Sequence, residues 1–132
     1  MAALSGIAVP VLLDTTDSAH QLLHQWTRMY HHGHQVLPTM AFMTFLLYLY
    51  SSIKRRHSRL ALAGLTTLTM VPFTWLAMVP TNNELFRLEL AGRMEPSVAS
   101  IQDVRGLVVH WSWLHVVRTT FPFVGAVLGT LG

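Results

Sequence analysis

The sequence contains no cysteine, and charged residues are scarce in it. Without a thiol, the chain can use neither a cysteine nucleophile nor a redox-active cysteine pair, and no disulfide can point to its compartment. Charged residues make up 11% of the 132 residues, whereas a soluble domain carries about a quarter. Hydrophobic residues make up 52%. This length and composition predict a single domain, residues 1–132, embedded in a lipid bilayer.

The few charges leave three long apolar runs, at 36–53, 60–79 and 107–131. As helices, the first two would be about 27 and 30 Å long at ~1.5 Å per residue, which matches a hydrocarbon core of ~30 Å. The opening stretch 1–13 is apolar but too short to cross, and it lacks the basic leader of a signal peptide. We interpret it as the second half of a first span. The sequence therefore predicts an all-α fold, an integral-membrane four-helix bundle with several crossings.

The basic residues form no face interleaved with aromatic residues, so the net charge of +3 does not indicate nucleic-acid binding. Four of them instead crowd one short connection: Lys54, Arg55, Arg56 and Arg59. The positive-inside rule places this connection in the cytosol and the polar segments 14–35 and 81–106 on the opposite side. Both polar segments are therefore expected to meet at one membrane face.

The polar segments are expected to contain short amphipathic helices at the membrane interface. In the first segment, Ser18 can cap a helix and Gly33 suits its end. A proline is tolerated in a first helical turn, so the second span would then begin near Pro38. This pattern predicts an interfacial helix that is separate from the span after it.

Two prolines shape the expected third span. Pro72 removes one backbone donor, and it should kink the helix and free the carbonyl group of Leu68. Pro80 is expected to stop the span, with a second short amphipathic helix after it, capped by asparagine and ended by Gly92. The segment 94–106 is expected to be an irregular or partly helical lead into the last span.

The last span carries the most informative residues. Trp111, His115 and Arg118 stand at positions i, i+4 and i+7, so they share one helical face. An arginine within an apolar run is costly unless it faces the bundle interior and finds a partner, and such residues are functional by default. The alternative is a structural arginine that pairs with helix ends or reaches the interface.

Two further groups of residues have the chemistry of a binding site. Capping would explain one of the adjacent amides Asn82 and Asn83, and it leaves the other free to hold a ligand oxygen. Trp26 and Tyr30 lie one turn apart on one helical face. These two rings fit either an aromatic belt at the membrane interface or a platform for stacking a substrate.

A stripe of histidines raises the question of a metal. Imidazole is a common ligand for zinc, copper and iron, and the candidate ligands are His20, His24 and His31. The chain contains no HExxH motif, however, and carboxylates are few. A hydrated histidine stripe is favoured over a metal site.

Taken together and in order, these motifs resemble the anthrone oxygenases, small four-span membrane proteins of aromatic polyketide pathways. The resemblance covers nearly the whole chain. Its residues are Gly6, the segment 9–13, Trp26, Tyr30, Gly33, His34, Pro38, the segment 80–83, Leu85, Trp111, His115 and Arg118.

The resemblance implies that O2 oxidises the central methylene of an anthrone, giving the anthraquinone, without flavin, haem or added metal. The protein would need to supply a base, stabilise the substrate anion and exclude water. His115 would be the base, and Arg118 with Asn82 or Asn83 would hold the anionic oxygens. The expected substrate-binding residues are Trp26, Tyr30, His34, Thr81, Trp111 and Trp113.

Two other classes of protein remain open at this point. The chain could be a metal-dependent membrane oxidase that works through the histidines, or a non-catalytic membrane subunit whose aromatic faces pack on partner helices. The expected partners are a small aromatic polyketide and the lipid bilayer. In a eukaryote, the expected location is an endoplasmic-reticulum-type membrane, with several crossings.

Overall fold

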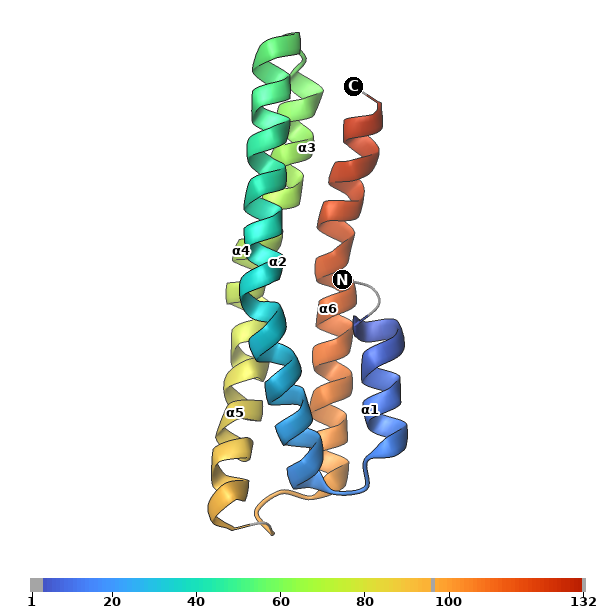
Figure 1. Ribbon diagram of the computed structural model, residues 1–132, viewed down its shortest axis with the longest axis vertical. Helices are drawn as coiled ribbons and strands as arrows, with labels where there is room; N and C mark the ends of the chain where they lie inside the picture. Colours follow the sequence, from blue (N-terminus) through green and yellow to red (C-terminus); the bar gives the residue numbers. More distant parts are fainter. Residues whose placement is uncertain (1–3, 96, 132) are drawn as a thin grey trace.

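The computed structural model describes residues 4–95 and 97–131, and every regular element within these ranges is helical (Figure 1). The all-α fold is therefore confirmed. The first three residues of the predicted opening span lie outside the described residues. The elements in chain order are η1 (Leu4–Ala8), α1 (Val9–Thr15), α2 (Ala19–Arg55), α3 (Ser58–Leu68), α4 (Met70–Phe73), η2 (Thr74–Met78), α5 (Val79–Met94) and α6 (Ile101–Thr130), where η marks a π-helical turn.

The helices form an elongated antiparallel bundle. Helix α2 runs the length of the molecule, the chain returns beside it through α3, α4, η2 and α5, and α6 then runs back toward the first turn (Figure 1). Helix α1 lies against the first half of α6. The basic turn between α2 and α3 lies at one end of the bundle, and the α1–α2 and α5–α6 connections lie at the other. The side of a membrane that each end faces stays a prediction.

Helix α2 is continuous from Ala19 to Arg55, so the prediction of two helices divided near Gly33 and Pro38 was wrong. Ser18 does occupy the N-cap position, but its side chain makes no capping hydrogen bond. Among the described glycines none has a positive φ, so Gly33 keeps a helical backbone. Pro38 costs one backbone hydrogen bond. The contacts of α2 with α3, α5 and α6 outweigh that local loss.

The segment that runs back beside α2 is irregular near Pro72, where the sequence predicted a kink. Helix α3 ends at Leu68, and the short α4 and the π-helical turn η2 follow before α5. Pro80, however, does not stop the helix, which corrects the prediction. It stands in the first turn of α5, where its missing N–H is not needed, so Thr81, Asn82 and Asn83 are helical. Gly92 likewise lies inside α5, which continues to Met94.

The core lies in the half of the bundle where α1, α2, α5 and α6 meet. Its largest buried side chain is Trp26, which is fully buried with Leu22, Leu85 and Val108. The other half of α2 exposes large apolar side chains, among them Leu47 and Ile53. Two helical stretches, Ala19–Arg55 and Ser58–Met94, are long and apolar enough to cross a bilayer. These two stretches are consistent with the predicted membrane location.

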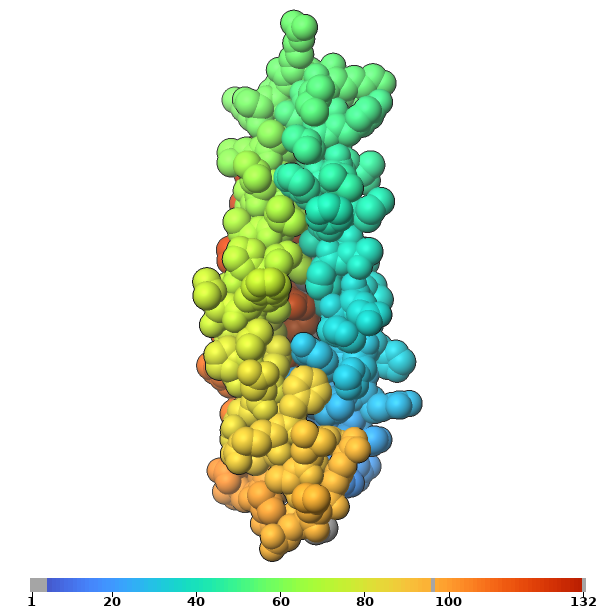
Figure 2. All heavy atoms as spheres, turned by 90° about the vertical axis from the view of Figure 1, so that its left-hand side faces the viewer, coloured from blue at the N-terminus to red at the C-terminus, as the bar shows by residue number. Residues whose placement is uncertain are grey.

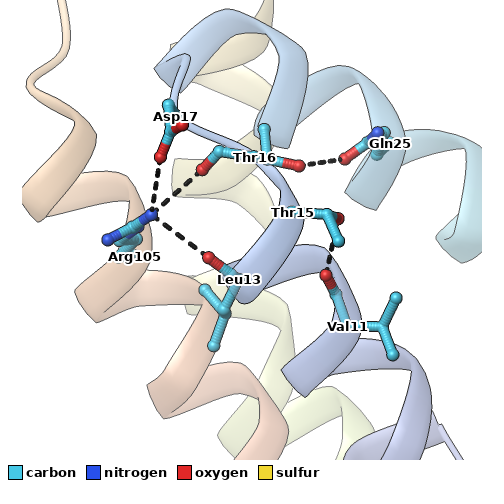
Figure 3. Close-up of polar contacts among 7 residues, drawn as sticks. All are labelled: Val11, Leu13, Thr15, Thr16, Asp17, Gln25 and Arg105. Atoms are coloured by element: carbon cyan, nitrogen blue, oxygen red, sulfur yellow. Dashed lines mark hydrogen bonds and ion pairs between the residues drawn. The ribbon is translucent and has the colours of Figure 1, made fainter.

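Arg105 fastens the end of α1 to α6 (Figure 3). Its Nη2 atom donates to the carbonyl oxygens of Leu13, at 3.1 Å, and Thr16, at 3.0 Å. Asp17 lies 3.6 Å from the same nitrogen. The hydroxyl group of Thr16 also donates to Gln25, which ties the connection to the first turns of α2. One arginine of α6 therefore orders the path of the chain from α1 into α2.

Candidate active site

A cavity of about 250 Å³ lies between α2, the η2–α5 segment and α6. In Figure 2, part of α6 is visible through a gap between α2 and the returning chain, so the cavity opens on the side of the bundle. Its lining residues are Met29, Tyr30, Gly33, His34, Leu37 and Pro38 of α2, Thr74, Trp75, Met78, Val79 and Asn82 of η2–α5, and Trp111, His115 and Arg118 of α6.

The face of α6 that the sequence singled out forms one wall. Trp111, His115 and Arg118 are all buried and all line the cavity. The ring centroids of Trp111 and His115 are 4.8 Å apart, at an interplanar angle of 60°. The spacing of these residues places them on the same side because α6 is continuous from Ile101 to Thr130.

Arg118 fixes the hydrogen-bonding state of His115. Its Nη2 lies 2.7 Å from the Nε2 atom of His115, and a guanidinium group can only donate. Nε2 therefore accepts, and the proton of the neutral imidazole sits on Nδ1. This Nδ1 is buried and has no hydrogen-bond partner within the described chain.

The guanidinium group of Arg118 is oriented by neutral groups. Its Nη1 donates to the hydroxyl oxygen of Thr74 at 3.4 Å, and that hydroxyl donates to the carbonyl oxygen of Met70 at 2.7 Å. None of the ion pairs among the described residues includes Arg118. The wall therefore presents a fixed positive charge without a carboxylate partner, which suits an anionic ligand.

Several polar atoms around the cavity have no partner within the described chain. The donors are Nε1 of Trp111, Nδ1 of His115 and Nε of Arg118, and the acceptor is Oδ1 of Asn82. A buried polar group without a partner costs about 1–3 kcal/mol. A ligand that brings oxygen atoms to α6 and a hydroxyl group to Asn82 would recover part of this cost.

The opposite wall is aromatic. Tyr30 and His34 stack at a centroid distance of 5.4 Å and an interplanar angle of 5°. Trp26 does not line the cavity but supports this wall from behind, with its ring 5.4 Å from Tyr30 and 5.9 Å from Trp111. Phe86 packs edge-on against Tyr30 at 5.0 Å. Aromatic side chains of α2 therefore line the same cavity as the polar groups of α6.

Besides Trp26, three predicted site residues do not line the cavity. Asn83 is exposed, Thr81 is buried beside the cavity lining, and Trp113 is 66% exposed. Trp113 instead borders a separate hollow of about 280 Å³ between α1 and α6. The site therefore gathers Asn82 without Asn83 and Trp111 without Trp113.

The sequence reasoning found Asn82 but missed two other cavity residues of the η2–α5 segment, Thr74 and Met78. Thr74, Met78 and Asn82 follow each other at intervals of four residues, and all three line the cavity. Helical spacing would have revealed them if the helix had been continued through Pro80. Phe86 is the next residue in the same series.

The three histidines of the metal hypothesis are exposed on α2. The Nδ1 atom of His24 lies 4.0 Å from the carboxylate of Glu89, which Arg93 holds at 2.7 Å. His31 packs near the rings of His34 and Phe86. Among the described residues, no three His, Asp or Glu side chains are grouped closely enough to hold a metal ion.

The profile of the anthrone oxygenase family matches residues 26–128. An anthrone oxygenase of Paecilomyces divaricatus is 57% identical over 139 residues, which cover 100% of this chain and 85% of that protein. Those of Cryptosporiopsis sp. and Aspergillus fumigatus are 47% and 45% identical, over 100% and 98% of this chain and 76% and 81% of their own length. No solved structure matches the chain.

Proposed function

The chain belongs to the anthrone oxygenase family, and from this membership we propose that it oxidises an anthrone-type polyketide with O2 to the anthraquinone. The observation that carries the proposal is that Arg118, which has no ion-pair partner among the described residues, lies beside His115 in a cavity also lined by aromatic rings. Flat rings suit a fused aromatic substrate. The fixed charge suits the anion that such a substrate forms when it loses a proton.

The reaction balances without an external reductant. The central methylene of the anthrone loses a proton, and the resulting anion gives one electron to O2. The substrate radical and superoxide combine, a proton is taken up, and the hydroperoxide at the former methylene carbon loses water. One oxygen atom ends in the new carbonyl group and the other in water, while the methylene supplies all four electrons. The protein need only move protons, stabilise the anion and hold the two reactants together.

His115 is assigned as the base and Arg118 with Asn82 as the groups that hold the anionic oxygens. In the structure described above, Nε2 of His115 is occupied by Arg118. A substrate oxygen that attracts the guanidinium group would release Nε2, which could then accept the proton. Trp111, Tyr30 and His34 would hold the rings in place, with Trp26 behind them. Asn83 and Trp113, which face away from the cavity, have no role in this assignment.

We also propose that the protein crosses an endoplasmic-reticulum-type membrane several times. The two long apolar stretches and the exposed apolar side chains of α2 support this location. A side opening toward lipid would suit a poorly soluble polycyclic substrate. A metal-dependent oxidase and a non-catalytic subunit are the alternatives that the experiment must separate.

The test is turnover of an anthrone by purified, metal-stripped protein in lipid nanodiscs. We expect oxygen uptake to equal anthraquinone formation, and the label from ¹⁸O2 to appear in the new carbonyl group. Heat-inactivated protein across the same pH range corrects for spontaneous oxidation. Activity lost on chelation and restored by one specific metal would instead assign the reaction to a metal centre, with His20, His24 and His31 as the first candidates. No turnover above the heat-inactivated control would indicate a non-catalytic subunit.

A further inference from the structure

Gly33 stands in the interior of α2 without an evident structural need. A glycine destabilises a helix interior relative to alanine, so its presence there is usually explained by a positive φ or by the close approach of neighbouring atoms. Neither applies here. No described glycine has a positive φ, and a Cβ added at Gly33 would meet nothing within 4 Å. At Gly64, by contrast, an added Cβ would lie 3.1 Å from the Cβ of Tyr48.

What Gly33 borders is the cavity. Tyr30 and Leu37 stand about one helical turn before and after it, and His34 follows it directly, and all of these residues line the same space. At position 33 the wall is therefore the backbone of α2 itself. The stacked rings of Tyr30 and His34 flank this bare stretch, and Trp111 lines the cavity from α6.

We propose that Gly33 is a specificity-determining residue, whose missing side chain leaves room for one ring of a flat polycyclic substrate to lie directly against α2. The inference rests on the proposed function for the identity of that substrate. A side chain at position 33 would take the space that a substituted ring needs. Gly33 would then set how large a ring substituent the enzyme accepts.

The experiment compares Gly33→Ala and Gly33→Leu with Gly106→Ala. Alanine and leucine are both strong helix formers. Gly106 is the matched control because it lies inside α6, away from the cavity, and a Cβ added there also meets nothing within 4 Å. Turnover is measured with an unsubstituted, a dihydroxylated and a methylated anthrone. Binding of the corresponding anthraquinones is followed separately by quenching of tryptophan fluorescence, since Trp75 and Trp111 line the cavity.

We expect all three variants to fold, with thermal midpoints at or above that of the wild type. Gly33→Ala should raise KM for the methylated anthrone about 10–200-fold, the range for one methylene in an apolar pocket. The fall in kcat/KM should be smaller for the unsubstituted anthrone, which lacks the methyl group that the added Cβ would crowd. Gly33→Leu should lose binding of the methylated anthraquinone, and Gly106→Ala should match the wild type in every measurement.

The binding series separates this inference from the proposed function. A wild type that turns over no anthrone but binds the anthraquinones, with binding lost in Gly33→Leu, would reject the proposed reaction and support the role of Gly33. Wild-type binding and kinetics in both Gly33 variants would overturn the inference. It would also be overturned if the wild type bound none of the anthraquinones.

Discussion

At the scale of the residue, Arg118 is the most unusual feature of the molecule. Its side chain is 7% exposed, and its contacts are an imidazole nitrogen and a hydroxyl oxygen, both neutral. Removing an ion from water costs several kcal/mol unless an opposite charge is close. A protein that holds a cation in this state keeps it ready for an incoming anion, because the orientation of the guanidinium group is already set.

The first prediction concerns Arg118→Lys. The variant keeps the charge but loses the planar fork that can grip two oxygens of a flat anion. We expect kcat to fall by about 10²–10³, the range for removal of one donor to a developing oxyanion. The measurement is anthrone turnover by protein matched for membrane expression. Arg28→Lys, at an exposed position on α2 outside the cavity lining, is the control and should be unaffected. Equal activity in the two variants would remove Arg118 from the mechanism.

The second prediction concerns His115→Ala and His115→Gln. Loss of the base should lower the rate by about 10²–10⁴, and glutamine should not restore it because an amide cannot take up a proton at neutral pH. His110→Ala is the matched control, since His110 is exposed on the same helix and lies outside the cavity lining. If well-expressed His115→Ala turns over an anthrone at near wild-type rate, the base should be sought at Tyr30 and His34.

At the scale of the element, the sequence predicted the cavity wall on α6, but on the η2–α5 segment it predicted Asn82 without Thr74 and Met78. Trp111, His115 and Arg118 could be grouped from spacing alone because no signal interrupts α6 between them. A proline is compatible both with the end of one helix and with the first turn of the next. Local sequence therefore cannot assign Pro80 to either position, and only tertiary contacts place it in the first turn of α5.

The same misread boundary explains the pair of asparagines. In a loop, Asn82 and Asn83 could both turn toward a ligand. In a helix with 3.6 residues per turn, neighbouring side chains point about 100° apart, so only one of them can face the cavity. Gly33 and Pro38 led to a similar wrong prediction. A glycine usually marks the end of a helix and a proline its start, but packing along α2 overrides both signals.

The third prediction concerns the fastening of α1. Arg105→Gln should remove the charged donor that serves the carbonyl oxygens of Leu13 and Thr16. Hydrogen bonds to charged groups contribute about 1.5–3 kcal/mol each, so the variant should lower the free energy of unfolding by about that amount or more. Arg87→Gln is the control, because Arg87 makes an exposed pair with Glu84, worth about 1 kcal/mol or less. The measurement is thermal unfolding in one detergent, and equal midpoints for the two variants would contradict the prediction.

At the scale of the whole molecule, the bundle has two chemically distinct ends. The basic turn at Lys54–Arg59 forms one end, and the connections after α1 and α5 form the other. Four basic residues within six positions favour the cytosol for the first end.

The fourth prediction tests this orientation. Because the natural chain contains no cysteine, single cysteines at Ser52 and Ser97 can be labelled without background. An impermeant thiol reagent added to sealed microsomes should label Ser97→Cys only after the vesicles are opened and Ser52→Cys directly. Equal labelling of the two variants in detergent would show that their cysteines are equally reactive. Labelling of both variants from the same side would reject the proposed topology.

The length of α2 has a consequence for where the chemistry occurs. With 37 residues, α2 is about 55 Å long at ~1.5 Å per residue, whereas the hydrocarbon core is ~30 Å thick. If Ile53 marks one surface of that core, the other surface falls near His34, roughly 19 residues away. The cavity would then lie at a phase boundary. An apolar substrate would enter from the hydrocarbon core of the bilayer. The protons and the water released by the reaction would leave toward the aqueous phase, so a single opening would connect the site to both solvents.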